Sequence, residues 1–460
     1  MSSPTPKSVR RRLAVLADAA RFDAPCAART GAAAGAPPRH PLPRLGLAAA
    51  DRDVEPAAIY HSVAADGRRI PLLKLLLTNH CVYDCAYCPL RRSRDQERAR
   101  LDVHEVVRLT LDYHRRGLVD GLFLSAAVDG SADATMEQMV AVARTLRREH
   151  QFAGYVHLKV IPEASRELIA EAGRWADRVS VNVELARQGD LDALAPGRAH
   201  ATMRGAMARV RDGIAEAHEA ERRSARAESR RRWGVGRAGG RRERWDQTPR
   251  FAPAGQVTQL VVGADRPGVA PATDADVLRL AATLYRREGL RRVYFGSYQP
   301  VDGAGGLLVD AASPAVRERR LYEADWLVRV YGFSVDELAP ADAPNLAADL
   351  DPKLAWALRH PELFPVDLNA APRELLLRVP GLGHTTVDRI LALRPFHMVR
   401  VELLKKLGVP VRRVLPFVVT PDHAPTRVGP HSADLRAHVL GAAPGRARGP
   451  RQLDLFDAAA

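Results

Sequence analysis

Cysteine is scarce in this sequence. Only four of the 460 residues are cysteine, and three of them, Cys81, Cys85 and Cys88, lie within a stretch of eight residues. A disulfide framework needs cysteines distributed along the chain, so this pattern argues against one and favours a reducing compartment. Long apolar runs are lacking too, and a membrane-spanning helix needs about 18 consecutive apolar residues. The basic amino-terminal segment is interrupted by Asp18 and Asp23, unlike a secretory signal. We therefore expect a cytoplasmic protein.

Acidic residues are outnumbered by basic ones, 54 to 69, which gives a formal net charge of +15. Lysine is rare, so arginine carries most of the positive charge. A basic balance favours polyanionic partners, because Lys and Arg displace counterions from phosphates. A GC-rich coding sequence would also enrich arginine without selection for binding. The charge is thus a moderate indication of nucleic acid, from which we expect association with the nucleoid.

The three clustered cysteines, spaced CxxxCxxC, come directly after an apolar run, PLLKLLLTNHC, that predicts a buried strand. Clustered thiolates suit a soft metal or an iron–sulfur cluster. Three ligands on a four-iron cluster leave one iron open for chemistry. The alternative is a structural zinc site, which wants a fourth ligand that His80 or Cys26 could supply.

This spacing and position resemble the radical S-adenosylmethionine (SAM) superfamily. The resemblance implies a 4Fe–4S cluster on Cys81, Cys85 and Cys88, SAM bound to the fourth iron, and an external electron donor. It further implies that SAM is held at the ends of strands and in the loops after them. The residues that we expect there are Ser125, Asn182, Glu184 and Gly263. Alternation along the strand predicts that Asn182 and Glu184 share one face.

Apolar strand-like runs alternate with amphipathic stretches from Pro71 to Val301, which predicts six βα units in series and a parallel sheet. The expected fold class is α/β: a partial (β/α)6 TIM-like barrel at residues 70–335, as in radical SAM enzymes, with a carboxy-terminal all-α domain. Residues 1–69 would form an amino-terminal helix and a connector. Residues 221–250, with 11 arginines and four acidic residues, would form a flexible insertion that either clamps nucleic acid or is simply solvated.

The predicted second domain, residues 336–420, contains two helical segments joined by Val379-Pro380-Gly381-Leu382-Gly383. This pattern resembles the helix–hairpin–helix motif. Glycines permit a tight turn, and the free N–H groups of the second helix favour a phosphate. The resemblance implies DNA-backbone contacts by Gly381, Gly383, Thr385 and Thr386, with Leu382 filling the space between the helices. The alternative is a helical hairpin that serves only protein contacts.

The tail, residues 421–460, is rich in Pro, Ala, Gly and Arg and is predicted to be disordered. Its segment QLDLF resembles the bacterial sliding-clamp-binding pentapeptide. Gln452, Leu453, Leu455 and Phe456 would then contact the clamp, with the apolar side chains filling a pocket. The alternative is a short helix that docks on the body of the protein.

Taken together, the segment LADAARFDAPC, the cysteine motif and the hairpin resemble a bacterial family described as DNA modification or repair radical SAM proteins, linked to a uracil-DNA-glycosylase-like partner. The resemblance implies an enzyme that abstracts hydrogen from DNA through a 5′-deoxyadenosyl radical. Two other functions stay open. One is a radical SAM enzyme that modifies RNA such as tRNA, and the other is a non-catalytic iron–sulfur DNA-binding scaffold.

Overall fold

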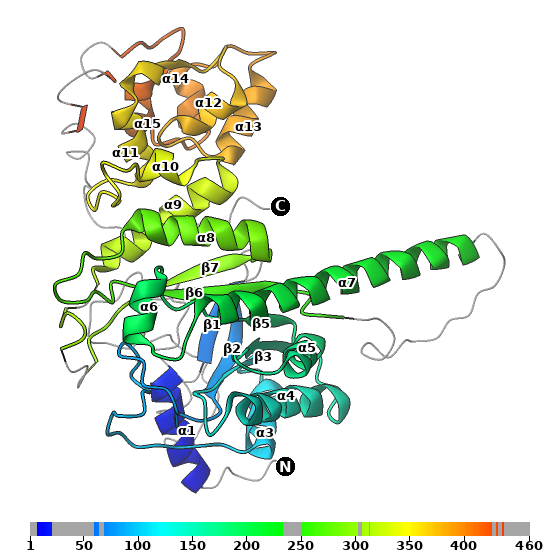
Figure 1. Ribbon diagram of the computed structural model, residues 1–460. Coiled ribbons are helices and arrows are strands. Elements are labelled where there is room, and N and C mark those ends of the chain that lie inside the picture. Colours follow the sequence, from blue (N-terminus) through cyan, green and yellow to red (C-terminus); the bar gives the residue numbers. More distant parts are fainter. Residues whose placement is uncertain are drawn as a thin grey trace. The chain divides into compact units, whose positions relative to one another are not determined.

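The computed structural model describes residues 7–20, 59–63, 69–232, 250–301, 306–311, 313–425, 429–430 and 435–436. The chain divides into two compact units (Figure 1). The first unit consists of Met1–Ala272 and Thr283–Ser313, and the second of Thr273–Ala282 and Pro314–Ala460. The boundary predicted at residue 335 therefore lies inside the second unit.

The first unit is built on one seven-stranded sheet whose strands follow one another in chain order. Its strands are β1 (Ile59–Val63), β2 (Arg69–Leu76), β3 (Gly121–Ser125), β4 (Tyr155–Lys159), β5 (Arg178–Ser180), β6 (Gln256–Val262) and β7 (Arg292–Ser297). Neighbours from β2 to β7 are parallel, whereas β1 pairs antiparallel with β2. The predicted series of six parallel strands is thus confirmed as a curled, partial barrel, and β1 is an edge strand that the sequence did not indicate.

Helices connect the parallel strands (Figure 1). They are α3 (Val103–Arg115), α4 (Ala132–Arg148), α5 (Arg166–Trp175), α6 (Gln188–Leu194), α7 (His200–Arg232) and α8 (Asp274–Glu288), and α1 (Lys7–Ala20) packs against β2. All five residues of β3 are buried. Burial on both faces explains why this strand is a nearly continuous apolar run, whereas β4 and β6 also contain polar residues and β7 has an alternating burial pattern. The shared direction of the strands brings the loops after them to one edge of the sheet.

Helix α7 corrects the prediction for the arginine-rich insertion. It continues to Arg232, so residues 221–232 are helical and not a loop. Figure 1 shows this helix projecting well beyond the sheet. Glu219 forms ion pairs with Arg222 and Arg223 one turn further on, which supports the helix in the projecting part. Residues 233–249 of the predicted insertion lie outside the described part of the chain.

The second unit is mainly helical. It contains α9 (Ala315–Val330), α10 (Val335–Leu338), α11 (Pro352–Arg359), α12 (Arg373–Arg378), α13 (His384–Leu393), α14 (Val401–Lys406) and α15 (Val411–Val414). Two short strands, β8 (Val366–Asp367) and β9 (Val418–Val419), pair in parallel. Phe364 joins its core, with ring contacts to Trp356 and Phe417. In the described part of the chain, no helix combines the length and the apolar character that crossing a bilayer requires.

Candidate active site and nucleic-acid interface

The cysteine loop, residues 77–92, leaves β2 at the carboxyl edge of the sheet. Its first residues run beside the loop that follows β3: the amide of Leu77 donates to the carbonyl of Ser125 at 2.8 Å, and the amide of Val82 donates to that of Val128 at 2.8 Å. Asn79 anchors the other side of the loop, since its side chain accepts from the Ala99 amide at 2.7 Å. The loop is therefore fixed at the place where barrel sites form.

The three cysteines share this loop. The amide of Cys88 donates to the Cys85 carbonyl at 2.9 Å, which closes a tight turn, and the Leu90 amide lies 3.4 Å from the Cys88 sulfur. The Ala86 amide donates to the carbonyl of Leu194 at the end of α6. Cys85 is buried, while Cys81 and Cys88 are half-buried, and all three are free thiols. This turn presents three soft ligands from one short segment.

The pKa of Cys85 and of Cys88 is raised to about 12, mainly by burial and in part by the neighbouring thiol groups. A thiolate in this loop therefore needs a compensating positive charge, which a metal centre provides. Among the described residues, no three His, Cys, Asp or Glu side chains converge as the ligands of a single ion would. Cysteine thiolates are the ligands that hold iron–sulfur clusters, so the chemistry of this donor set fits a cluster.

Ser125 ends β3 beside the cysteine loop, as predicted. Its side chain is only 1% exposed, and its hydroxyl oxygen has no hydrogen-bond partner among the described residues. A buried hydroxyl without a partner costs free energy unless a ligand satisfies it. This orphaned group is the observation that fits a polar cofactor, such as SAM, next to the cysteines.

Asn182 and Glu184 follow β5. The prediction that strand alternation places both side chains on one face is wrong, because Glu184 does not lie in an extended strand. The strand ends at Ser180, and Glu184 has a φ of +64°, outside the extended conformation that alternation requires. Its carbonyl accepts from the Val261 amide at 2.6 Å, which fixes this left-handed backbone. The Glu184 carboxylate helps to raise the pKa of Cys85 and Cys88, so it belongs to the surroundings of the cysteine loop. Left-handed non-glycine residues concentrate at functional sites.

Gly263 follows β6 with a φ of +81°. A Cβ at this position would lie 2.5 Å from the Cβ of Ser313, so packing against Ser313 already requires glycine. The Ser313 hydroxyl is itself buried and has no hydrogen-bond partner in the described part of the chain. A contact of Gly263 with SAM stays a prediction.

Arg198 is a residue of the site that the sequence did not indicate. Its guanidinium lies 4.6 Å from the ring centre of Tyr83, between Cys81 and Cys85 in the chain, and forms an ion pair of 3.5 Å with Glu163. Burial lowers the pKa of Arg198, but Glu184, Glu163 and Cys85 outweigh it and raise the pKa overall. Arg198 therefore brings a permanent positive charge to the cysteine loop from the segment that precedes α7.

The second unit places α12 and α13 around the predicted hairpin. Leu382 in the turn is buried, as are Val387 and Ile390 of α13. Gly381 has a φ of +86°, and a Cβ there would lie 2.8 Å from Val414. Gly383 is the N-cap residue of α13. The glycine at 381 is thus required by the turn and by packing within the unit.

A second turn lies beside the first. Gly408, with a φ of +72°, follows α14, and Pro410 precedes α15 and lies 3.3 Å from the position that a Gly381 Cβ would occupy. Thr385, at the start of α13, is exposed, and Thr386 is half-buried. Exposed basic side chains flank the second turn: Lys405, Lys406 and Arg412. Two adjacent turns thus lie beside exposed basic side chains, of which Lys406 forms an ion pair with Glu402 at 2.9 Å.

Lys353 supports the first turn from inside. Its ammonium nitrogen donates to the carbonyl of Leu382 at 2.6 Å and lies 4.8 Å from the ring centre of Tyr331. Burial, together with the nearby charge of Arg378, lowers the pKa of Lys353 to about 7. The predicted clamp-binding residues Gln452, Leu453, Leu455 and Phe456, and also Cys26, lie outside the described residues.

No protein-family model matches the sequence, and no curated protein matches it significantly. Among solved structures, the chain is similar to HydG, a maturase of the FeFe-hydrogenase, with a TM-score of 0.36 and 15% identity over 56% of this chain and 49% of that one. It is also similar to the FeFe-hydrogenase maturase HydG from Carboxydothermus hydrogenoformans, with a TM-score of 0.37 and 13% identity over 55% of this chain and 50% of that one. The chain thus spans about half the length of these structures, and a similarity of this degree carries no conclusion about the reaction.

Proposed function

We propose that this chain is a radical SAM enzyme that acts on DNA. The observation that carries the proposal is the position of Cys81, Cys85 and Cys88, which lie in the loop after β2 at the carboxyl edge of a partial barrel, beside the unsatisfied hydroxyl of Ser125. When bound there, a 4Fe–4S cluster and SAM would supply one-electron cleavage of the sulfonium and hence a 5′-deoxyadenosyl radical.

The residues of the site have separate tasks in this proposal. The three cysteines would hold the cluster. The Ser125 hydroxyl would donate a hydrogen bond to SAM, Asn182 and Glu184 would hold its ribose hydroxyls, and Gly263 would contact its adenine. Arg198 fixes the cysteine loop by stacking on Tyr83.

The proposed substrate is DNA, because the second unit carries two adjacent turns with positive-φ glycines and exposed basic residues beside them. As a tandem helix–hairpin–helix, this surface would grip the sugar–phosphate backbone through Gly381, Gly383, Thr385 and Thr386, without reading sequence. A target inside a duplex would have to be flipped out of the stack. Further proposed partners are an electron donor, a sliding clamp at the QLDLF segment and a uracil-DNA-glycosylase-like protein.

Anaerobic reconstitution tests the proposal. The protein should bind about four irons per chain, the number in one cubane cluster. After reduction, its electron paramagnetic resonance spectrum should change when SAM is added. Cys85→Ala should lose the iron. Cys26→Ala is the matched control, because Cys26 is a ligand only in the zinc alternative. Binding of zinc in place of iron, lost on Cys26→Ala, would refute the proposal.

Nucleoside mass spectrometry then separates the substrates. Incubation with SAM, reductant and duplex DNA should change the mass of a deoxynucleoside, whereas tRNA treated in parallel should stay unchanged. A modified ribonucleoside would favour the RNA alternative. A cluster whose electron paramagnetic resonance spectrum does not change on addition of SAM would favour the non-catalytic scaffold.

A further inference from the structure

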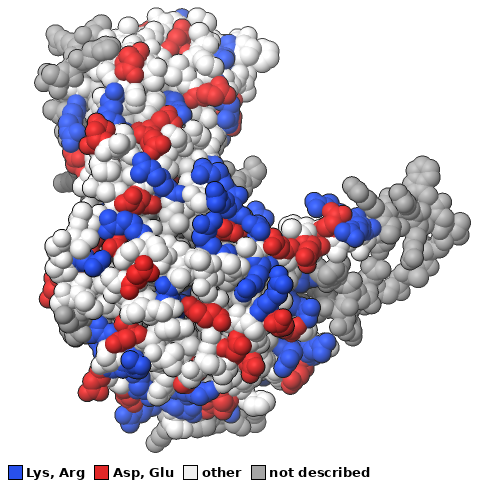
Figure 2. Space-filling view, in the orientation of Figure 1, with Lys and Arg blue, Asp and Glu red and all other residues white. Residues whose placement is uncertain are grey.

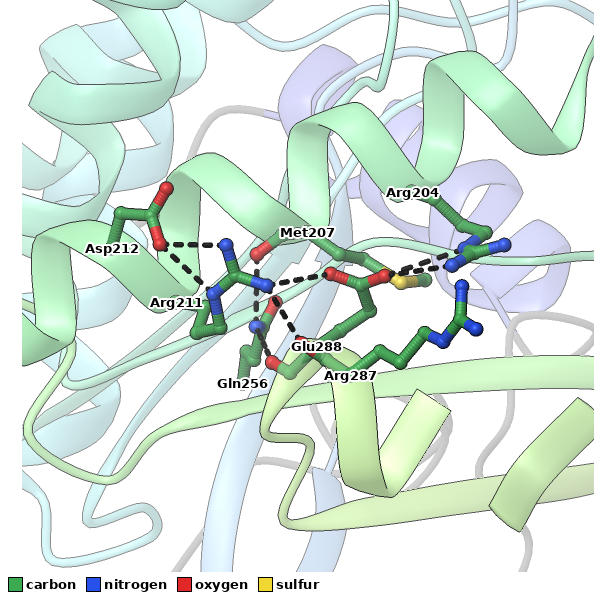
Figure 3. A network of polar contacts seen from close by, with 7 residues as sticks. All are labelled: Arg204, Met207, Arg211, Asp212, Gln256, Arg287 and Glu288. Carbon is green, nitrogen blue, oxygen red and sulfur yellow. Dashed lines mark hydrogen bonds and ion pairs between the residues drawn. The ribbon is translucent and has the colours of Figure 1, made fainter. Parts of the chain in front are cut away.

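A buried carboxylate joins α7 to the end of α8 in the first unit (Figure 3). Glu288 is only 4% exposed, and its carboxylate forms ion pairs with Arg204 at 3.3 Å and Arg211 at 3.5 Å. The side chain of Gln256 donates to the main-chain carbonyls of Glu288 and of Met207 in α7. Two guanidinium groups are therefore held in place around one carboxylate.

Three more arginines surround this network. Arg286, Arg287 and Arg291 are exposed, and none of them forms an ion pair with another described residue. The backbones of two of them belong to the network: the Arg287 carbonyl accepts from Arg211 at 2.7 Å, and the Arg291 amide donates to the Gln256 carbonyl at 2.8 Å. Arg286 precedes Arg287 in α8. We call Arg204, Arg211, Arg286, Arg287 and Arg291 the arginine cluster.

The positive charge of the arginine cluster is not balanced locally. Residues 204–212 and 286–291 contain six arginines and two acidic residues, Asp212 and Glu288, and both acids are already paired with Arg204 or Arg211. Figure 2 shows basic side chains gathered over α7 and the adjoining end of α8. Crowded like charges destabilise a protein on its own, and a bound polyanion relieves that repulsion.

We propose that the arginine cluster is a second contact for the phosphate backbone of duplex DNA, an inference that rests on the proposed function for its choice of DNA. Guanidinium groups match phosphate oxygens in pairs and stay charged at every physiological pH. The cluster lies at the amino ends of β6 and β7, whereas the cysteine loop follows the carboxyl end of β2. It would therefore hold duplex outside the reacting site and add affinity without reading sequence.

The salt dependence of DNA binding tests this proposal without any cofactor. A triple variant, Arg286→Ala, Arg287→Ala and Arg291→Ala, leaves the Glu288 ion pairs in place. In a plot of the logarithm of the association constant against that of the salt concentration, each lost phosphate contact makes the slope shallower by about 0.9. The triple variant should be shallower by about 2.7 and should bind a short duplex about tenfold or more weakly at ~0.1 M salt.

The matched control is the triple variant Arg108→Ala, Arg115→Ala and Arg144→Ala on α3 and α4, where the side chains are also exposed and the net charge changes equally. It should leave the slope nearly unchanged. Replacing the three cluster arginines by lysine should restore the wild-type slope, since the charge is kept. Equal slopes for the cluster and control variants would overturn the proposal, as expected if the cluster binds an acidic protein instead. Equal slopes would say nothing against SAM cleavage by the wild-type protein. Conversely, a wild-type protein that does not cleave SAM but still shows the steeper slope would refute the proposed enzyme activity and not the arginine cluster.

Discussion

The buried Lys353 makes the stability of the second unit depend on pH. Its pKa falls from 10.5 in the unfolded chain to about 7 in the folded one, because burial and Arg378 disfavour the charged form. Between these two values the unfolded chain binds more protons than the folded one. The free energy of unfolding therefore rises with pH across this window. Integrated from pH 7 to pH 9, the rise is about 2 kcal/mol.

Hydrogen exchange of peptides from residues 352–394 measures this effect, after correction for the intrinsic pH dependence of amide exchange. Lys353→Met removes the titrating group, so its opening free energy should not rise between pH 7 and pH 9. Peptides from β3 and β4 in the first unit serve as an internal reference and should show no such rise in either protein. If wild type and Lys353→Met gave parallel pH profiles, the ammonium would not be buried as described and the reasoning would be refuted.

Three other substitutions have expected effects that can be measured. Arg147→Met should cost roughly 3–5 kcal/mol of stability in the first unit, because it removes a fully buried guanidinium that pairs with Asp177 at 2.6 Å and would leave that carboxylate without its cation; urea unfolding that shows under 1 kcal/mol would contradict this. Leu382→Ala should cost about 2–5 kcal/mol in the second unit through the cavity that it leaves, with no effect on iron loading. Gly381→Ala should destabilise the second unit more than Gly408→Ala. Both substitutions place alanine in a left-handed backbone, which costs about 1–2 kcal/mol, but only a Cβ at 381 also meets Val414. Equal losses of stability in thermal unfolding would show that the contact with Val414 is relieved.

The sequence predicted the architecture of the barrel because its strands carry strong local signals. A strand buried on both faces, such as β3, is a nearly continuous apolar run, and each predicted strand is followed by an amphipathic stretch. The positions of the three cysteines and of Ser125 followed from this, since strand ends meet at one edge of the sheet. The hairpin was predicted for a similar reason: its glycines have a local conformational cause.

Other features could not be predicted, because their causes are not local. Composition suggested a loop for residues 221–232, yet arginine, alanine and glutamate are good helix formers and extend α7. The left-handed backbone of Glu184 depends on its pairing with Val261, and Arg198 reaches the cysteine loop from a segment more than one hundred residues away in the chain. The arginine cluster needs two helices to meet at Glu288.

Formation of 5′-deoxyadenosine tests the central claim most directly. The reconstituted protein, incubated without oxygen with SAM, a low-potential reductant and duplex DNA, should release 5′-deoxyadenosine, and the yield should rise with DNA present. Cys85→Ala should release none, while Cys26→Ala should match the wild type. Equal release by the wild type and Cys85→Ala, or none from a wild-type protein with a full iron complement, would contradict the account.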